Sequence, residues 1–341
     1  MGSLRLADSA SLRGAAGGAA ALQPCFVFDA AEVRAGGPRR AAFVREAVCA
    51  LRGALAERES SLAVREGRPE DVLAALCEAT GATAVYAAAG TSYEALELEA
   101  RVRRALAAVG ATLELAWDAT LHAPDALPFE GGIEGLPSSF PQFREAADRM
   151  APPPAPLPPP ERMPPLPRAV RGHGDAWRRG RGGVAPNKVP SLRSLGAQAF
   201  CDAPPVGGGE PTALARLREA LTAGMAGAMV DSAQLQQSTG MGGNAEESTS
   251  EHRTRAKSLC QPPAALTGAD FSVRLSPWLA TGCVSARRVL TEACESGMLR
   301  SAEAEGLRFE LLWRDYFALV THKFALRQMR EAGVPEAASS F

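Results

Sequence analysis

The sequence lacks the patterns that mark a membrane protein, a disulfide-rich secreted protein or a zinc protein. Its apolar stretches are far shorter than the roughly 20 residues of a membrane-spanning helix, and no signal-peptide pattern opens the chain. The seven cysteines are scattered, with no C-x-x-C pair and no closely spaced set of histidine and cysteine. We therefore expect reduced thiols in an intracellular protein, with no disulfide framework, no metal site and no membrane partner.

Charge and glycine patterns set two further limits on ligands. The formal net charge is −1, so the chain has no overall electrostatic attraction to nucleic acid, and any anion site must come from a local patch. No G-x-G-x-x-G motif follows a predicted strand, so we do not expect a dinucleotide-binding fingerprint. Residues 1–20 are rich in alanine, glycine and serine but include Asp8, which leaves the compartment open between chloroplast, mitochondrion and nucleus.

Strand and helix signals alternate through the first third of the chain. Short apolar runs predict strands at 25–29, 61–67, 82–90 and 111–117, and amphipathic runs predict helices at about 38–58, 69–79 and 92–109. This alternation predicts an α/β domain with a doubly wound parallel sheet, whose ligands bind at the carboxyl ends of the strands. On the last helix, Glu97–Arg101 and Glu99–Arg103 have the four-residue spacing of surface ion pairs.

The composition changes after residue 127. The proline-rich stretch 151–167 predicts an extended linker, and the Arg/Gly-rich stretch 168–183 fits either a solvated loop or an arm that touches nucleic acid. Helix signals return at 210, with leucines on the inner face, and 224–250 has the composition of an insertion or loop. We therefore divide the chain into an α/β domain at 1–127, a linker region at 128–205 and a helical domain at 206–341.

The stretch "FSVRLSPWLATGCVSARRV" (271–289) predicts two helix starts. Ser276 followed by Pro277 has the pattern of an N-cap before a helix, and Ser285 is placed to cap the next helix. Ser272 and Arg274 precede the first start, where free backbone N–H groups favour an anion. Hydroxyls and one arginine at that place fit either a phosphate cradle or plain helix capping.

The stretch "FELLWRDYF" (309–317) puts charged residues into a run that is otherwise apolar and aromatic. Helical spacing places Glu310, Trp313, Arg314 and Phe317 on one stripe, while apolar side chains cover most of the remaining circumference. Either the stripe faces a cavity or a polar ligand, or Glu310 and Arg314 form an ordinary ion pair worth about 0.3 kcal/mol. Spacing alone does not separate the two interpretations.

With these stretches in place, the chain resembles the photolyase/cryptochrome family, and most closely its DASH-type cryptochromes. The resemblance runs along the whole chain and rests on these segments: "LRLADSASL" (4–12), "CFVFD" (25–29), "PRRAAFVREAVCALRGAL" (38–55), "ATAVYA" (82–87), "LPSSFPQFR" (136–144), "PPLP" (164–167), "VPSLRSLG" (189–196), "GGGEPTALARL" (207–217), "FSVRLSPWLATGCVSARRV" (271–289) and "FELLWRDYF" (309–317). The last two segments, in that order, are the specific ones.

The resemblance implies a light-dependent flavoprotein. Its α/β domain would hold a folate antenna such as methenyltetrahydrofolate, and its all-helical domain would hold FAD. In such proteins, blue light drives an electron from reduced FAD into a cyclobutane pyrimidine dimer, which splits, and DASH-type members resemble repair enzymes that prefer single-stranded DNA. The expected partner is therefore damaged DNA, and the expected oligomeric state is a monomer.

The resemblance also assigns roles to residues of this chain. The flavin-phosphate loop of the family corresponds to Ser272, Arg274, Leu275 and Ser276, and another FAD contact corresponds to Thr254 and Arg255. Glu310, Trp313 and Arg314 match positions that line the cavity where flavin and the flipped dimer meet, with Glu310 near the flavin as well. There, tryptophan would stack on an extruded base, while glutamate and arginine would hydrogen-bond to it or to its backbone.

Several departures from the family pattern affect the expected activity. The W-F-R-R-like strand of the family does not precede Leu4, and because that strand lies in mid-sheet, two neighbouring strands should lack partners. The stretch 251–256 lacks the family's tyrosine and asparagine, and the sequence stops at Phe341, before the family's remaining flavin-binding helices. The expectation is a chain truncated at both ends, with an incomplete helical FAD domain. Three functions stay open: photorepair, non-catalytic blue-light reception, or an inactive remnant.

Overall fold

The structure, a computed structural model, describes residues 3–169, 189–197, 207–221, 269–296 and 301–334, with backbone alone at 269–274 and 301–304. Its first part alternates helix and strand: α1 (Ala10–Ala16), β1 (Cys25–Phe28), α2 (Ala30–Ala56), β2 (Ala63–Glu66), α3 (Pro69–Thr80), β3 (Ala84–Ala88), α4 (Tyr93–Ala108) and β4 (Thr112–Ala116). Its second part is helical: η1 (Pro124–Ala126), η2 (Gly132–Gly135), α5 (Phe140–Asp148), a helix over 210–221, α9 (Ala269–Ala280), α10 (Ala286–Glu295) and α11 (Ser301–Glu331).

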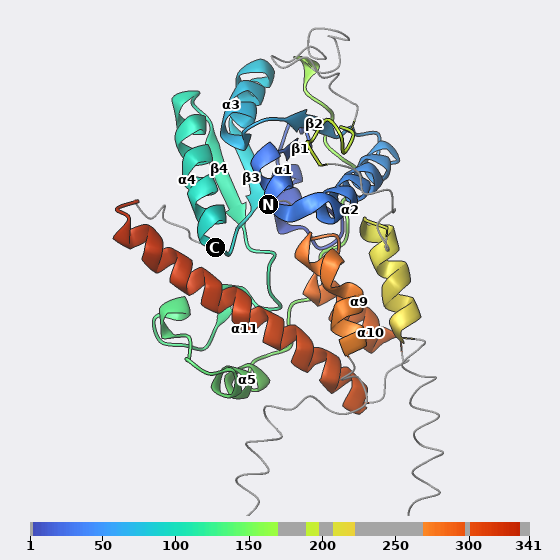
Figure 1. The fold of residues 1–341 in the computed structure, drawn as a ribbon, viewed down its shortest axis with the longest axis vertical. Coiled ribbons are helices and arrows are strands. Elements are labelled where there is room, and N and C mark those ends of the chain that lie inside the picture. Colours follow the sequence, from blue (N-terminus) through green and yellow to red (C-terminus); the bar gives the residue numbers. More distant parts are fainter. Residues whose placement is uncertain (1–2, 170–188, 198–206, 222–268, 297–300, 335–341) are drawn as a thin grey trace, which may run out of the picture.

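The four strands form two separate parallel pairs. β1 pairs with β2, with Cys25 opposite Ala63, and β3 pairs with β4, with Ala84 opposite Thr112. Figure 1 shows the strands between α2 on one side and α3 and α4 on the other. The predicted strands and their parallel sense are confirmed. The expectation that two neighbouring strands would lack a partner is also confirmed, because β1 and β3 belong to different sheets.

Helix α2 begins earlier than the sequence predicts. The apolar pattern places its start at Pro38, but the helix begins at Ala30, where the Asp29 carboxylate accepts a hydrogen bond of 2.7 Å from the backbone N–H of Ala31. That cap satisfies a free donor of the first turn. Gly37, with φ of 74°, provides the kink that lets the chain continue past the proline.

One of the two ion pairs predicted on α4 is confirmed. Arg101 lies 3.4 Å from Glu97, as the four-residue spacing predicts. The prediction of an ion pair between Glu99 and Arg103 is wrong. Glu99 instead accepts a hydrogen bond of 2.6 Å from the backbone N–H of Gly90, and Arg103 donates to a carbonyl of β4. Both groups thus tie the helix to the strand layer, because a buried backbone donor or acceptor gains more from a partner than an exposed ion pair does.

The middle of the chain agrees with the sequence where the structure describes it. The proline-rich stretch 151–167 contains no helix or strand, and 210–221 is helical with Leu217 and Leu221 buried. Residues 170–183 of the Arg/Gly-rich stretch and all of 224–250 lie outside the described residues. Within the described part, no helix is both long and apolar enough to cross a bilayer.

One hydrophobic core joins the strand layer to the helical part. Phe28 of β1 and Val48 of α2 belong to the same buried cluster as Leu307 and Leu312 of α11. At its centre Trp278 of α9 is fully buried, packs edge-on against Phe43 at 5.6 Å, and donates from its indole nitrogen to the carbonyl of Gly207. The domain boundaries at 127 and 205 stay a prediction, and the core crosses both of them.

A cluster of buried charges lies where the N-terminal segment meets the helices. Asp8 is fully buried and accepts two hydrogen bonds, of 2.9 and 3.0 Å, from the guanidinium of Arg287 in α10. It also accepts one of 3.0 Å from the backbone N–H of Leu157. Arg5 donates to the carbonyl of Asp8 and, at 3.0 Å, to that of Gly282. Every buried charge here has several partners, which is the condition for burying charges at all.

Two more carboxylates complete this cluster. Asp118, directly after β4, accepts from the backbone N–H of Ala10 at 3.1 Å and so caps α1. Glu210, at the start of the helix over 210–221, accepts from the backbone N–H groups of Leu6 and Ala7. The N-terminal segment is therefore held by carboxylates from both the strand layer and the helical part.

We predict that Asp8→Ala destabilises the protein by about 3–5 kcal/mol, because it leaves the guanidinium of Arg287 buried without its partner. Asp8→Asn should cost less, since asparagine tolerates the positive φ of 51° at this position and still accepts from Leu157. Urea unfolding would measure both. Asp125→Ala, an exposed aspartate in η1, is the control and should change stability by less than about 0.5 kcal/mol. Equal stability of Asp8→Ala and the control would contradict the role of the cluster.

Candidate functional site

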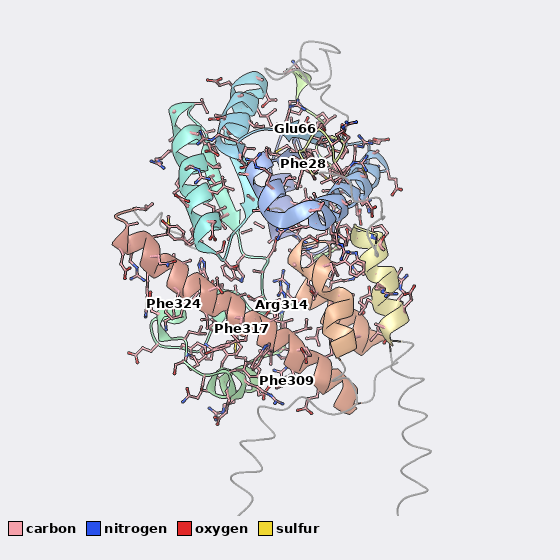
Figure 2. The ribbon with its side chains drawn as sticks, viewed as in Figure 1. Phe28, Glu66, Phe309, Arg314, Phe317 and Phe324 are labelled. Atoms are coloured by element: carbon pink, nitrogen blue, oxygen red, sulfur yellow. The ribbon has the colours of Figure 1, made fainter. Side chains whose placement is uncertain are left out.

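The predicted stripe on α11 is an aromatic surface with charged edges. Figure 2 shows Phe309, Arg314, Phe317 and Phe324 along the helix, which crosses the lower part of the molecule. Trp313 is 40% exposed and Phe317 is 48% exposed, so this face of α11 is not covered by the other described residues. Exposed aromatic rings side by side on one helix are unusual on a soluble surface and indicate a contact site.

The ring of Trp313 is held by other aromatic rings. It packs edge-on against Phe140 of α5, with centroids 4.5 Å apart, and lies nearly parallel to Phe309 at 6.3 Å. On the outer side it contacts Phe317 at 5.2 Å, and the guanidinium of Arg144 covers the Phe309 ring at 4.9 Å. Such contacts fix the ring orientation without covering it. The exposed part of Trp313 is therefore a preorganised stacking surface.

The two charged residues of the stripe do not pair with each other. Arg314 donates to the carbonyl of Ala119 at 2.7 Å and to the carboxylate of Asp315 at 3.2 Å. The alternative interpretation of the stripe, a Glu310–Arg314 ion pair, is wrong. Among the described residues Glu310 has no hydrogen-bonding or ion-pair partner, and partial burial raises its pKa above the ordinary value. Glu310 is thus an unengaged carboxyl group one turn from the exposed tryptophan.

Asp315 anchors α11 to the strand layer. Its side chain is buried and accepts a hydrogen bond of 2.7 Å from the backbone N–H of Leu121, in the segment that follows β4. Burial raises the pKa of this carboxyl to about 7, although Arg314 and the Leu121 donor oppose the shift. Within the "WRD" triplet, the two charged residues, Arg314 and Asp315, therefore hold the helix in place, while Trp313 is partly exposed.

His322 lies on the same helix, two turns further along. It is buried, packs edge-on against Trp117 at 5.0 Å, and its Nδ1 has no partner among the described residues. Burial lowers the pKa of His322 to about 4, so the ring is neutral near pH 7. His322 and Asp315 face the same segment after β4 but their pKa values move in opposite directions.

The predicted flavin-phosphate loop differs from the expectation. Ser276 is not an N-cap: α9 starts at Ala269, runs through Pro277 and ends at Ala280. Leu275 is 1% exposed and Trp278 is fully buried, and their packing maintains the helix across a proline that would otherwise interrupt it. The second predicted helix start is confirmed, because Ser285 caps α10: its hydroxyl accepts a hydrogen bond of 3.0 Å from the backbone N–H of Arg288.

The predicted ligand residues are thus only partly assembled in the described structure. Ser276 is exposed on α9, and Leu275 points into the core. The side chains of Ser272 and Arg274, and all of Thr254 and Arg255, lie outside the described residues. Among the described residues, no hydrogen bond, ion pair or ring contact joins α9 to the stripe on α11. The cofactor roles of these residues stay predictions.

The residues that position α11 could not be predicted from the sequence. Neither the Arg314–Ala119 contact nor the Asp315–Leu121 contact has a local signature, because the partners are backbone groups nearly two hundred positions away. One signal was present: a carboxylate beside an arginine in an apolar helix needs a buried partner. That signal indicates that partners exist but does not identify them.

Comparison with known proteins gives the site a family context. The DNA photolyase family model matches residues 2–161. A cryptochrome DASH from Gloeobacter violaceus is 33% identical over 304 residues, covering 87% of this chain and 52% of the relative. The chain belongs to the photolyase/cryptochrome family. The sequence resemblance and the predicted class, an α/β part followed by a helical part, are confirmed.

Other members of the family match over nearly the whole chain. The blue-light photoreceptor PHR2 of Arabidopsis thaliana is 29% identical, covering 97% of this chain and 70% of the relative. The cryptochrome structure from Synechocystis aligns with a TM-score of 0.68 at 25% identity, over 94% of this chain and 60% of that one. A photolyase from Sulfolobus tokodaii, solved with two FAD molecules, aligns with a TM-score of 0.57 at 17% identity and shows the fold alone. The chain spans about half the length of its Gloeobacter relative.

The opposed titrations of Asp315 and His322 predict a pH dependence that single substitutions reveal. Asp315 stabilises the fold at low pH and loses that contribution as pH rises from about 4 to about 7, because its folded pKa is raised to about 7. His322 stabilises it above pH 6.5 and loses that contribution as pH falls toward 4, because its folded pKa is lowered to about 4. In the native protein, these two contributions to the pH dependence of the free energy of unfolding have opposite signs and partly cancel.

We therefore expect Asp315→Asn to make the free energy of unfolding rise more steeply with pH between 4 and 7 than in the native protein. His322→Gln should make it rise less steeply or fall. Urea unfolding at pH 4, 5, 6 and 7 measures both slopes, and each variant is the control for the other. Parallel pH profiles for the native protein and Asp315→Asn would contradict the raised pKa of Asp315.

Proposed function

We propose that this chain takes part in blue-light-driven repair of cyclobutane pyrimidine dimers in single-stranded DNA, by electron transfer from reduced FAD. The observation that carries the proposal is the exposed, preorganised face of Trp313, one turn from the unpartnered carboxyl of Glu310. Membership of the photolyase/cryptochrome family supports the reaction class. The face on α11 is the proposed contact surface for the extruded dimer.

Base stacking suits the geometry of Trp313. An unpaired base stacks on an aromatic ring for about 1–3 kcal/mol, and this term does not depend on sequence. Phe140 and Phe309 fix the ring before any ligand arrives, so little conformational entropy is lost on binding. Phe317 extends the same surface by one turn. A dimer of two adjacent pyrimidines needs such an extended apolar surface.

Glu310 and Arg314 supply the polar contacts in this proposal. Because its pKa is raised, Glu310 is protonated more often near neutral pH than an ordinary glutamate, and it can then donate a hydrogen bond to a pyrimidine carbonyl oxygen. Arg314 is fixed by Ala119 and Asp315 yet its side chain is 33% exposed, so the rest of the guanidinium can reach a DNA phosphate.

The described residues fit a flavin in part. Glu310 is an unengaged polar group facing the proposed site, and Ser276 exposes a hydroxyl on α9, whereas Leu275 is taken up by the core. When bound, reduced FAD would supply the electron that opens the cyclobutane ring. The flavin roles of Ser276 and Glu310 are part of this proposal, as are a folate antenna in the α/β part and the division into domains at 1–127, 128–205 and 206–341.

A second candidate is non-catalytic blue-light reception. The name of the PHR2 relative, which matches over 97% of this chain, favours it. The two functions share flavin binding and differ in whether illumination changes DNA. A single protein preparation, tested for flavin binding and then for a light-dependent change in DNA, therefore distinguishes the two functions.

The first test is flavin retention followed by repair. Purified chain is incubated with FAD, desalted and examined by absorption, and then illuminated with a single-stranded oligothymidine that carries one dimer. The proposal predicts retained flavin absorbance and restoration of the thymines under blue light only. Retained flavin without repair would favour the photoreceptor, and a spectrum of protein alone would contradict both functions for this chain.

The second test addresses the surface itself and does not require flavin. Trp313→Ala should weaken binding of the dimer-containing oligonucleotide by roughly 5- to 150-fold, the equivalent of about 1–3 kcal/mol of stacking. Phe324→Ala removes a ring that is 55% exposed on the same helix and is the matched control. Fluorescence anisotropy with a labelled oligonucleotide measures both. Equal losses for the two variants would contradict a specific role for Trp313.

A further inference from the structure

The proline-rich stretch after α5 has a backbone conformation that its sequence dictates. Every residue of 151–160 is either a proline or directly precedes one. Proline fixes φ at about −65°, and a residue before proline is restricted to extended conformations. Ten such residues in a row predict a polyproline II helix, with three residues per turn and a length of about 28 Å.

The exposure of the side chains follows this three-residue repeat. One set at the repeat is half-buried against the molecule: Pro153, Pro156 and Pro159. The next set is exposed: Pro152, Ala155 and Pro158. The remaining set is exposed in its first two members: Ala151 and Pro154. We call the five exposed residues the proline ridge. The helix thus lies with one face on the protein and leaves two faces uncovered by the other described residues.

Hydrogen bonds to distant parts of the chain hold the helix in place. The carbonyl of Leu157 accepts one of 2.7 Å from the backbone N–H of Asp8, and the N–H of Leu157 donates one of 3.0 Å to the Asp8 carboxylate. The carbonyl of Pro160 accepts one of 3.3 Å from the guanidinium of Arg58. These contacts use the backbone, so they fix the stretch without covering the proline ridge.

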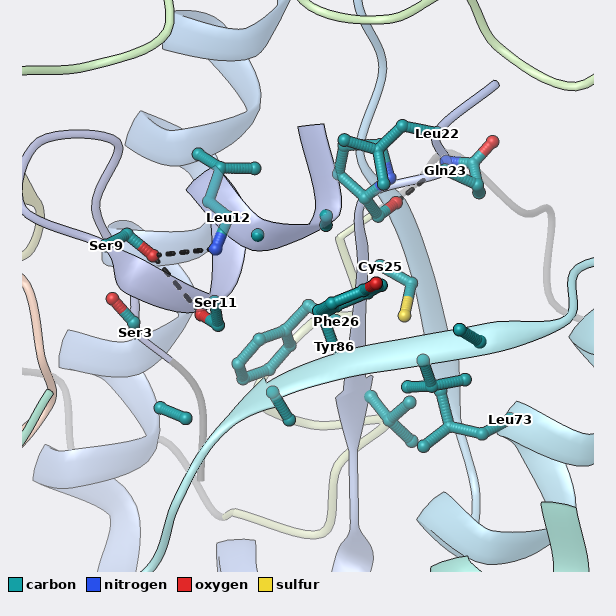
Figure 3. Close-up of a pocket in the computed structure, with 18 of the residues that line it drawn as sticks. Ser3, Ser9, Ser11, Leu12, Leu22, Gln23, Cys25, Phe26, Leu73 and Tyr86 are labelled. Atoms are coloured by element: carbon teal, nitrogen blue, oxygen red, sulfur yellow. Dashed lines mark hydrogen bonds between the residues drawn. The ribbon is translucent and has the colours of Figure 1, made fainter. Parts of the chain in front are cut away.

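The chain that follows the helix is fixed as well. The carbonyl of Pro165 accepts a hydrogen bond of 3.0 Å from the backbone N–H of Leu22, which lines the pocket drawn in Figure 3. Met163 packs against the main hydrophobic core, and Pro167 is buried. The proline ridge is therefore preorganised in both conformation and orientation, and little conformational entropy is lost when a partner binds it.

The composition of 151–160 selects one mode of recognition. Seven of its ten residues are prolines, which lack the N–H groups that strand addition to a partner's sheet requires. The stretch contains no charged residue, so it offers no ionic contact to a phosphate or a nucleic acid. Its one large aliphatic side chain, that of Leu157, is half-buried. What remains is a rigid row of proline rings, which proteins recognise with grooves lined by aromatic side chains.

We propose that the proline ridge docks into the aromatic-lined groove of a separate proline-recognition domain, of the SH3, WW or EVH1 kind. The two uncovered faces of the polyproline II helix enter the groove, while the half-buried face stays on this protein. Apolar contact between proline rings and aromatic rings supplies the affinity. The proline ridge shares no residue with the stripe on α11, and its docking needs neither flavin nor DNA, so the proposal is independent of the proposed repair function.

The direct test is isothermal titration calorimetry with the full chain. A purified SH3 domain, a WW domain and an EVH1 domain are titrated in turn, and each domain that binds is tested again with its groove tryptophan changed to alanine. We expect at least one domain to bind and its groove variant to bind at least about tenfold more weakly. A decaproline peptide should displace the chain, because it presents the same helix. Binding by none of the three domains, or binding that survives loss of the groove tryptophan, would overturn the proposal.

Two double variants locate the contact on this chain. Pro152→Ala with Pro158→Ala removes two exposed rings, and Pro156→Ala with Pro159→Ala removes two half-buried rings from the same helix. The second is the matched control, because both variants lose two prolines. We expect the first to weaken binding of the domain by at least about tenfold and the second by less than about threefold. Circular dichroism confirms that both are folded. Equal losses of affinity would overturn the proposal.

A gain of affinity gives an independent measurement. Ala155 is exposed between Pro152 and Pro158 at the three-residue repeat, and it already precedes a proline. Ala155→Pro therefore suits the existing backbone, adds one ring to the proline ridge and stiffens the helix. We expect it to tighten binding of the same domain by about threefold or more. Unchanged or weaker binding of Ala155→Pro would overturn the proposal.

Discussion

The buried ion pair between Asp8 and Arg287 is the interaction on which the arrangement of the molecule depends. It joins a short N-terminal segment to α10 across the whole intervening sequence, and Arg5 and Asp118 extend it to the strand layer. Charges this deeply buried gain little net energy over a well-packed apolar core, but a misplaced partner is costly. The cluster therefore allows one relative placement of the strand layer and the helices.

The proposed DNA surface also depends on charged groups with fixed partners, here where α11 meets the segment after β4. Arg314 and Asp315 bind backbone groups of the segment after β4, which fixes the rotation of α11 about its axis. Once the rotation is fixed, Trp313 must lie on the outer face, where Phe140 and Phe309 hold its ring. Arg314 and Asp315 thus act by orientation: they hold the helix, so that Trp313 and the exposed part of the Arg314 guanidinium face the proposed ligand.

The sequence predicted what local patterns determine. The four strands and the start of α10 at Ser285 follow from apolar periodicity and capping chemistry, which act over a few residues. The start at Ser276 was wrong because the packing of Leu275 and Trp278 outweighs the local proline signal. Periodicity identified the stripe around Trp313, but not that Arg314 would leave Glu310 unpaired, since its partner is a distant backbone carbonyl. The functional roles came from family resemblance and not from spacing.

The central claim is that buried charges and one shared core make the strand layer and the helical part a single cooperative unit. Differential scanning calorimetry of the whole chain at pH 7 tests it most directly. The account predicts one transition in which the calorimetric enthalpy equals the van't Hoff enthalpy. Two resolved transitions, or a calorimetric enthalpy well above the van't Hoff value, would show that the two parts unfold separately and would contradict it.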